Sequence, residues 1–396
     1  MDERFQALGE LAVHGANVQP GQILAVGAAL GQQELARAVA AAAYRKGAVY
    51  VDVAYFDAFV KRARLENADP ETLEFVPSWL TSRLLTLADR GDARMAFSWL
   101  VAPDVFNGVD PSLLGKDQLP RLKEASRVVA ERSTNWTIVP CPHPDWAALV
   151  YPELDRDAAY ERLWDELWHI LRLDEPDPAA VWDERMALLK ASADTLTERH
   201  FDAIELKGPG TDLTIGLFAS GSWEAGDFTT RNGLRHLPNL PTEEVFTTPD
   251  PLRTEGYVTS TKPLALEDGV IVRGLRVRFE GGRAVQIDAD ENAEALRAKA
   301  ALDDGAAMLG ELALVDGQGR IGPLGTVFYD TLLDENAASH IALGNGFPFA
   351  VGEEDSSRVN ESRTHIDFMI GSPELEVTGV KDGERFPVLR NGAWQF

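Results

Sequence analysis

The first half of the chain alternates between apolar runs of strand length and longer segments with the composition of helices. Residues 21–30 and 48–57 look like buried strands, and residues 31–47 between them look like a helix that ends at Gly47. This order is typical of a β-α-β unit, in which a helix connects two parallel strands. The alternation continues through three further segments, at residues 93–105, 119–133 and 136–142. The pattern predicts an α/β N-terminal domain with an open, largely parallel sheet over residues 1–195.

The turn after the first apolar run, VGAALG at residues 26–31, follows a strand and precedes a helix, as phosphate-binding turns do. Its glycines lack the spacing of the GxGxxG and P-loop motifs, which favours a purely structural turn. Farther along, helical segments at residues 160–176 and 178–196 are separated by a turn-like DEPDPAA. The second of these helices leads out of the first domain.

Beyond residue 195 the pattern changes to short strands separated by turns. Residues 203–217 look like a hairpin around Gly-Pro-Gly, and residues 270–291 look like another around Glu-Gly-Gly, because apolar and polar positions alternate on both sides. Further expected elements are two strands and one helix, at residues 311–316, 365–371 and 293–310. The second half is therefore predicted to be a β-rich α+β C-terminal catalytic domain over residues 196–396.

Composition narrows the range of functions. The chain has 396 residues and a formal net charge of −25, which excludes electrostatic capture of nucleic acid, because phosphate binding needs basic patches. Its single cysteine, Cys141, cannot form an intrachain disulfide. The N-terminus lacks the pattern of a secretory signal, and no apolar stretch is long enough to span a membrane. We expect a cytoplasmic protein with neither a membrane nor a nucleic acid as partner.

Side chains that bind hard metal ions are concentrated in the second half of the chain. They lie in four separated blocks, which hold Glu243 and Glu244, then Glu311, then Glu335 and His340, then His365 and Asp367. Carboxylates outnumber imidazoles, and no thiol is present among them. This balance suits one or two divalent ions, such as Zn, Co, Mn or Mg, with positions left open for water and substrate. The sequence thus predicts a metal-dependent hydrolase.

Local geometry indicates which side chains share a site. Adjacent residues of an extended segment point to opposite sides, so only one of Glu243 and Glu244 is expected to face the site, and we choose Glu244. His365 and Asp367 are separated by one residue and would share one face of a strand. A buried histidine paired with a carboxylate is the commoner explanation of a lone His-x-Asp.

The other two blocks give weaker indications. Glu311 lies at the junction of an expected helix and an expected strand, where a solvated acid is the commoner explanation. Glu335 and His340 would be about one and a half turns apart on a short helix, so they need not share a face. No single block therefore identifies the site by itself.

Taken together, the blocks resemble a known family. The segments NLPTEEVFTTP, LGELALV, FYDTLLDENAASHIALG and THIDFMIGSPELEVTG are similar, in order and spacing, to the aminopeptidase T and aminopeptidase S family of thermophilic-type metallo-aminopeptidases. The resemblance covers the second half of the chain strongly, whereas the first half matches mainly in length and architecture. Four blocks in sequence are far more specific than any one of them.

The resemblance implies an enzyme that removes N-terminal residues from peptides through a metal-activated water. It implies two divalent metal ions, which could be Zn, Co or Mn. The family's metal-ligand positions correspond to Glu244, Glu311, His340, His365 and Asp367 in this chain. A free carboxylate should move the proton from water to the leaving amine, and Glu311 and Glu335 are both candidates. The family resemblance further implies peptide substrates with a free N-terminus and a homodimer.

One position departs from the family pattern. Family members commonly carry a tyrosine seven residues after the first of these histidines, where its hydroxyl is expected to assist at the active site. This chain has Phe347 there, and a phenyl ring cannot donate a hydrogen bond to a developing oxyanion. Losing one such donor typically costs on the order of a hundredfold in turnover, unless Tyr329 or another donor replaces it.

Two other functions are compatible with these residues. A fold similar to this family's also serves mononuclear Fe(II) ring-cleaving dioxygenases, for which His340, His365 and Asp367 would form the metal-binding triad. A site for one iron does not require Glu244 and Glu311. The second alternative is a non-catalytic paralogue that binds metal or peptides, and the absence of the tyrosine hydroxyl is all that favours it.

Overall fold

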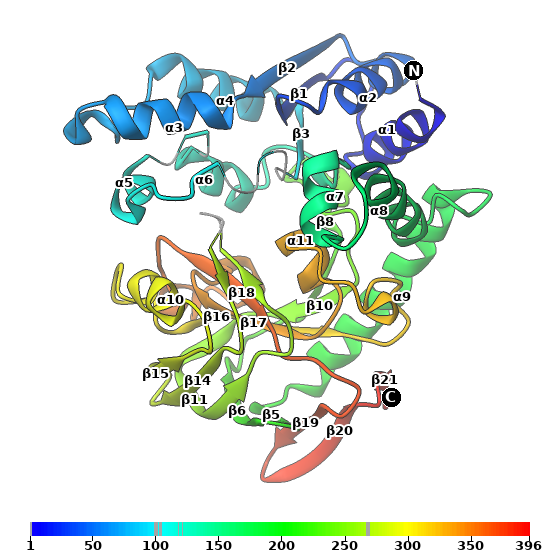
Figure 1. The fold of residues 1–396 in the computed structure, drawn as a ribbon. Helices are drawn as coiled ribbons and strands as arrows, with labels where there is room; N and C mark the ends of the chain where they lie inside the picture. The colour runs from blue at the N-terminus through cyan, green and yellow to red at the C-terminus, as the bar shows by residue number, and fades with distance from the viewer. Residues whose placement is uncertain (1, 99–101, 103–104, 118, 121, 267–269) are drawn as a thin grey trace. The chain divides into compact units, whose positions relative to one another are not determined.

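The computed structural model describes the whole chain except residues 1, 99–101, 103–104, 118, 121 and 267–269. Contacts group the chain into two compact units. The first consists of Met1–Asp183 with Asp227–Pro241, and the second consists of Glu184–Gly226 with Thr242–Phe396. Each unit has its own sheets, which Figure 1 shows in blue to cyan for most of the first unit and in green to red for the second.

The first unit contains a parallel sheet of four strands in the order β2-β1-β3-β4. Its strands are β1 (Ile23–Ala29), β2 (Tyr50–Phe56), β3 (Ala93–Phe97) and β4 (Trp136–Val139). Strand β1 lies between two neighbours, and Leu24 and Val26 are fully buried in it, which explains its almost entirely apolar sequence. The predicted β-α-β unit is confirmed, with α2 (Gln33–Arg45) connecting β1 to β2.

Helices precede, connect and follow these strands. They are α1 (Glu3–Gly15), α3 (Ala58–Asn67), α4 (Ser78–Arg90), α5 (Pro111–Lys116), α6 (Glu124–Ala130), α7 (Pro144–Val150), α8 (Arg156–Ile170) and α9 (Pro178–Arg199), besides α2. Short elements of this unit are η1 (Pro70–Thr72), β8 (Phe228–Thr229) and β9 (Arg235–His236). Helices α8 and α9 confirm the two helices expected before residue 195. Of the segments expected at residues 93–105 and 119–133, residues 99–101, 103–104 and 121 lie outside the described part of the chain.

The second unit contains two large antiparallel sheets. The five-stranded sheet has the order β18-β17-β16-β10-β7, with β7 (Glu224–Ala225), β10 (Glu244–Thr247), β16 (Leu309–Val315), β17 (His340–Gly344) and β18 (His365–Met369). The eight-stranded sheet has the order β15-β14-β11-β6-β5-β19-β20-β21, with β5 (Ala203–Gly208), β6 (Thr211–Leu217), β11 (Pro249–Thr259), β14 (Arg276–Glu280), β15 (Arg283–Asp288), β19 (Glu376–Lys381), β20 (Glu384–Arg390) and β21 (Ala393–Trp394). Shorter elements are β12 (Leu264–Ala265), β13 (Ile271–Val272), α10 (Ala293–Ala300), α11 (Thr331–Glu335), η2 (Gly322–Leu324), η3 (Pro348–Ala350) and η4 (Ser356–Arg358).

The second unit confirms both predicted hairpins, as β5-β6 and β14-β15. The helix expected over residues 293–310 is shorter than predicted, because α10 ends at Ala300. The Asp303 carboxylate explains this early end: it accepts hydrogen bonds from the Ser362 hydroxyl and the Arg363 N–H, both at 2.8 Å, and so fixes the chain in a turn. Within the part of the chain that the structure describes, no helix is both long and apolar enough to cross a membrane.

Candidate metal centre

The four blocks of candidate ligands lie on four neighbouring strands of the five-stranded sheet. In strand order they are Glu244 (β10), Glu311 (β16), His340 (β17), and His365 with Asp367 (β18). Paired positions of adjacent strands point to the same face of a sheet. Ala342 pairs with Glu311 on one side and with Asp367 on the other, so both carboxylates lie on one face. The small side chain of the alanine leaves space between them.

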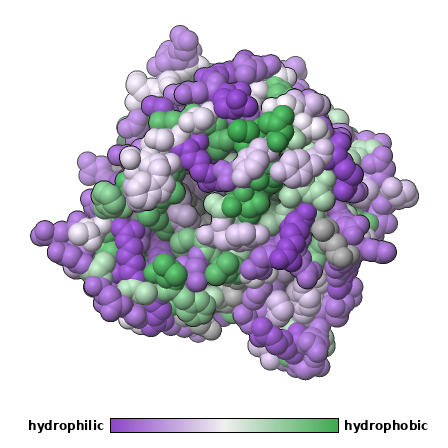
Figure 2. Space-filling model, turned by 90° about the horizontal axis from the view of Figure 1, so that it is seen from above, coloured by the Kyte–Doolittle hydropathy of each residue, from purple (hydrophilic) through white to green (hydrophobic). Residues whose placement is uncertain are grey.

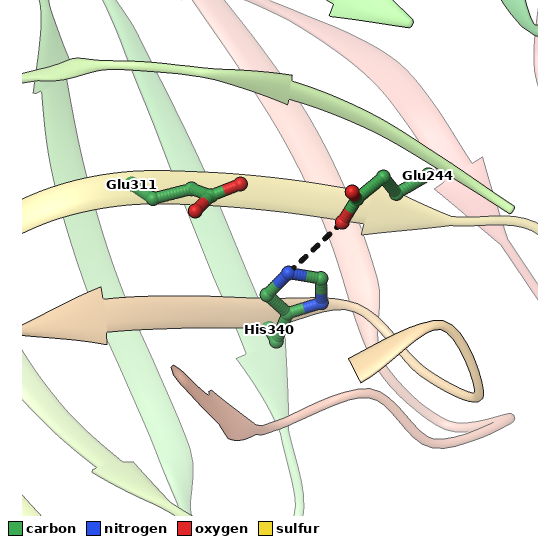
Figure 3. Close-up of side chains that lie close together, drawn as sticks. All are labelled: Glu244, Glu311 and His340. Carbon is green, nitrogen blue, oxygen red and sulfur yellow. Dashed lines mark ion pairs between the residues drawn. The ribbon is translucent and has the colours of Figure 1, made fainter. Parts of the chain in front are cut away.

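Two groups of ligand atoms form on this face, and Glu311 belongs to both. In the first, Nε2 of His340 lies 3.1 Å from Oε2 of Glu244, as Figure 3 shows together with the nearby Glu311 carboxylate. In the second, Nε2 of His365 lies 3.0 Å from Oε2 of Glu311 and 3.2 Å from Oδ1 of Asp367. Within each group the ligand atoms lie within 4.8 Å of one another. The arrangement therefore offers two adjacent places for a cation.

The outer nitrogen of each imidazole faces a backbone carbonyl. Nδ1 of His340 lies 3.1 Å from the Ala338 oxygen, and Nδ1 of His365 lies 2.8 Å from the Asn345 oxygen. With a proton on Nδ1, each ring donates to that carbonyl and turns the lone pair of Nε2 toward the carboxylates. Metal-binding histidines are commonly oriented in this way by an acceptor on the far nitrogen.

The carboxylates and imidazoles change one another's proton affinity. Burial alone would lower the pKa of His340, but the adjacent Glu244 carboxylate, with the charges of Glu311 and Asp367, raises it to about 10. Likewise, Asp367 and Glu311 outweigh burial and raise the pKa of His365 well above its usual range. Burial raises the pKa of the Glu311 carboxyl. Protons on the imidazoles thus compensate the buried carboxylates, a role that a divalent cation also fills.

Two buried carboxylate oxygens fit a metal better than they fit a hydrogen-bond donor. Oε2 of Glu244 and Oδ1 of Asp367 form no well-aligned hydrogen bond with any described residue, although His340 and His365 lie close to them. Buried polar atoms are nearly always satisfied, so such exceptions call for an explanation. Oxygen and imidazole ligands that converge without bonding one another suit a divalent ion such as Zn, Co or Mn.

Glu335 lies near these groups but belongs to neither of them. Burial raises the pKa of its carboxyl well above the usual range, and the charges of Asp367 and Glu244 raise it further. Helix α11 ends at Glu335 and His340 begins a strand, so the expectation that both lie on one short helix is wrong. Glu311 also differs from its local expectation, because it is only 5% exposed within β16 and is not a solvated acid.

No sequence motif indicates the buried network around Glu243. Nε of Arg185 lies 2.6 Å from Oε2 of Glu243, and the two Nη atoms of the same guanidinium donate to Asp316 at 3.1 and 2.8 Å. The Glu243 N–H donates to Oδ1 of Asn336 at 2.6 Å. Glu243 therefore faces away from the ligand groups while Glu244 faces them, as the alternation along a strand predicts.

Phe347 and Tyr329, which were singled out in the sequence, and the buried His236 lie as follows. The ring centroid of Phe347 is 5.4 Å from that of His365, so the phenyl ring lies directly beside the centre. The Tyr329 hydroxyl, considered as a substitute donor, lies 3.4 Å from Nη2 of Arg273. His236 is buried in β9 beside Trp136, where burial lowers its pKa to about 4.

The whole chain is similar to known metallopeptidases. The family model for the thermophilic metalloproteases (M29) matches residues 1–394. Aminopeptidase T of Thermus aquaticus is 40% identical over 403 residues, which cover 99% of this chain and 98% of that protein. Aminopeptidase PepS of Streptococcus thermophilus is 36% identical over 97% of this chain and 96% of its own. The solved structure of wild-type AmpT from Thermus thermophilus superposes with a TM-score of 0.92 at 39% identity, covering 100% of this chain and 99% of that one.

Proposed function

Because the chain belongs to the thermophilic metalloprotease family M29 and is a metal-dependent aminopeptidase, we propose that it removes N-terminal residues at a pair of divalent metal ions. The observation that carries the proposal is that the two ligand groups share Glu311. In this assignment Glu244 and His340 would hold one ion, His365 and Asp367 would hold the other, and Glu311 would serve both.

The charge of the centre supports two ions over one. Glu244, Glu311, Glu335 and Asp367 together carry four negative charges when they are ionised, and two divalent cations neutralise four. A single divalent ion would leave an excess of buried negative charge, which is unfavourable at low dielectric constant. The mixed oxygen and imidazole ligands admit Zn, Co and Mn, among which availability decides as much as affinity.

The protein's own part in the reaction is to hold and move a proton. When bound, the metal ions supply a Lewis acid for the scissile carbonyl and lower the pKa of the attacking water. Glu335 lies beside both ligand groups but belongs to neither, so its carboxyl is available to accept a proton from water and then donate it to the leaving amine. We assign proton transfer to Glu335 and metal binding to Glu311, which the sequence alone left undecided.

Substrate binding and assembly follow the same assignment. The substrates are peptides with a free N-terminus, whose ammonium group is attracted by the carboxylates that surround the centre. From the family resemblance we also propose that the working form is a homodimer, and from the sequence that it is cytoplasmic. Light scattering coupled to size-exclusion chromatography measures the assembly, and a mass near the 43.3 kDa of one chain would contradict the homodimer.

The Fe(II) dioxygenase alternative is not favoured. The named relatives are aminopeptidases, and two carboxylates beyond a histidine-and-aspartate triad, those of Glu244 and Glu311, converge on the same face. A mononuclear iron site requires neither of them.

Hydrolysis of an amino-acid anilide series tests the proposed function. Metal-free protein is supplied separately with Zn, Co, Mn and Fe(II), and the Glu244→Ala variant is compared with Glu376→Ala, which removes an exposed acid from β19 of the same unit. We expect cleavage that a divalent metal restores, that Glu244→Ala abolishes and that Glu376→Ala leaves unchanged. No cleavage with any ion, or equal activity of the two variants, would rule out the assignment.

A further inference from the structure

One buried asparagine connects the proposed proton-transfer residue to the segment that carries a metal ligand. Asn336 directly follows Glu335, the last residue of α11, and its side chain is fully buried. Its Oδ1 accepts a hydrogen bond of 2.6 Å from the Glu243 N–H, and its Nδ2 donates to the Leu332 carbonyl at 2.9 Å. Nδ2 also lies 3.5 Å from Oε1 of Glu335. One side chain thus contacts α11, the Glu335 carboxylate and the backbone next to β10.

The residue at the other end of this connection is firmly held. Glu243 is fully buried, and Nε of Arg185 donates to its Oε2 at 2.6 Å. The next residue along the chain is Glu244, which belongs to the first ligand group. Because the two glutamates are adjacent, the bond from Asn336 to the Glu243 N–H sets where α11 ends relative to this ligand.

The contacts of Asn336 require a side chain that accepts and donates at the same time. A primary amide does both, since its carbonyl oxygen accepts and its NH₂ group has two protons to donate. Aspartate has the same shape but cannot donate when it is ionised, and alanine can do neither. The amide is also uncharged, so it contacts Glu335 without adding a further negative charge to the buried carboxylates of the centre.

We propose that Asn336 is a positioning residue for proton transfer, which holds the Glu335 carboxylate in a fixed place relative to Glu244. The inference rests on the proposed function, because it needs Glu335 to carry the proton. In that reaction Glu335 takes a proton from the attacking water as the water oxygen bonds to the scissile carbonyl carbon. It then gives the proton to the leaving nitrogen as the C–N bond breaks. A displacement of about 1 Å can slow such a step severely, so the carboxylate has to be held.

Two substrates that differ in the leaving group test this role. The nitrogen of leucine anilide needs a proton to leave, whereas the phenolate of leucine phenyl ester leaves without one. Asn336→Ala removes all three contacts, and Asn336→Asp keeps the acceptor for the Glu243 N–H but loses the donor. Asn360→Ala is the matched control, because Asn360 is another buried asparagine of the second unit, whose Nδ2 donates to the backbone carbonyls of residues 305, 308 and 344.

We expect both Asn336 variants to raise the ratio of kcat for the ester over kcat for the anilide by about tenfold or more. General acid–base catalysis typically contributes about 10²–10⁴-fold, and a misplaced carboxylate loses part of it. Asn360→Ala should leave this ratio unchanged, even if both rates fall with stability. An unchanged ratio in the Asn336 variants, or an equal rise in the control, would overturn the inference. If Asn336→Ala does not fold, the ratio in Asn336→Asp decides.

Hydrogen exchange gives a readout that does not depend on activity. Exchange at the Glu243 N–H, followed by mass spectrometry of the segment before β10, should be faster in Asn336→Ala and unchanged in Asn336→Asp and Asn360→Ala. Exchange that Asn336→Ala does not accelerate would show that Asn336 does not hold this segment, and would also overturn the inference. If the metal-loaded wild-type protein cleaves neither substrate, the proposed function itself fails, which is a different outcome from cleavage with an unchanged ratio.

Discussion

Phe347 brings a phenyl ring to the edge of the metal centre, where a phenol would add a hydrogen-bond donor. We expect Phe347→Tyr to raise kcat about tenfold or more, because one oxyanion donor typically contributes 10²–10³-fold. The KM for a leucine anilide should change little, since the ring and its contacts remain. Steady-state kinetics with the metal-loaded protein measure both constants. An unchanged kcat would mean that a hydroxyl at this position does not reach the developing charge.

The second prediction for single residues separates the roles of Glu335 and Glu311. Glu335→Gln keeps the size of the side chain but cannot carry a proton, so kcat should fall about a hundredfold or more while the bound metal is retained. Glu311→Gln should lose metal, because both ligand groups use this carboxylate. Elemental analysis of dialysed protein, run beside the kinetics, distinguishes the two. If Glu335→Gln also loses metal, Glu335 is a ligand and another group carries the proton.

Single residues differ in how far the sequence determines their place. The alternation along a strand depends only on the backbone, so the choice of Glu244 over Glu243 and the shared face of His365 and Asp367 could be predicted. Glu311 could not be placed from its own segment. Its burial comes from pairing with β10 and β17, whose sequences lie far from it. The whole set of blocks, not the local pattern, indicated its role.

Among the elements, β10 and β16 are joined by an arginine from a helix. Arg185 in α9 forms ion pairs with Glu243, just before β10, and with Asp316, just after β16, and its side chain is only 6% exposed. These two strands carry Glu244 and Glu311. The indole of Trp394 also donates to Asp316, at 2.9 Å. The network thus fixes the ends of two of the three strands that carry the first ligand group.

We expect Arg185→Met to lower the free energy of unfolding of the second unit by about 3 kcal/mol or more, because it removes a buried guanidinium from two buried carboxylates. Arg385→Met is the control. It breaks an ion pair with Glu205 in which the arginine side chain is 62% exposed, and exposed pairs contribute less than about 1 kcal/mol. Urea unfolding followed by tryptophan fluorescence measures both variants. Equal midpoints would show that Arg185 does not support the strands.

The boundaries of elements were the least predictable feature at this scale. Hydrophobic periodicity predicted the β-α-β unit and both hairpins, because strand and helix periods are local properties. It failed where a distant hydrogen bond ends a helix. After α10, the Asp303 carboxylate accepts hydrogen bonds from residues 362 and 363. At the end of α11, the Asn336 side chain donates to the Leu332 carbonyl at 2.9 Å, and its Oδ1 accepts from the Glu243 N–H. These partners are adjacent only after folding.

The molecule as a whole is strongly acidic. The formal net charge is −25, and hydrophilic residues predominate on the face drawn in Figure 2, with hydrophobic residues in scattered groups. Most of the acidic side chains are accessible to solvent, but the carboxylates of the metal centre are buried. A net negative charge of this size opposes the compact state through self-repulsion. Cations held inside the second unit should therefore contribute to stability as well as to activity.

Removal of metal tests this contribution. Chelation should lower the melting temperature. Zn, Co or Mn added at about a hundred times its Kd should restore about 2.7 kcal/mol of unfolding free energy. For a unit of this size, that corresponds to a shift on the order of 5–10 °C. Glu244→Ala should reduce the shift, since the first ligand group loses a carboxylate. Differential scanning calorimetry measures the transition, and a melting temperature independent of chelator and metal would contradict the expectation.

The fold class and the family could be predicted from the sequence. Each ligand block is a run of consecutive residues, and the periodicities of helices and strands are properties of neighbouring residues. The grouping of residues 227–241 with the first unit has no such local origin. It depends on contacts between distant positions, such as the hydrogen bond of 2.7 Å from Nδ2 of Asn17 to the Arg235 carbonyl. Patterns of neighbouring residues carry no information on such pairs.

If Glu311 serves two ions, as proposed, then those ions would not bind independently. An ion held by one ligand group would draw electron density from the common carboxylate and restrict its rotamer, which would weaken its remaining oxygen as a donor but would hold it in place for the other group. The balance of these opposing effects sets the cooperativity of loading. A protein with one ion would then differ in its affinity for metal from the metal-free protein.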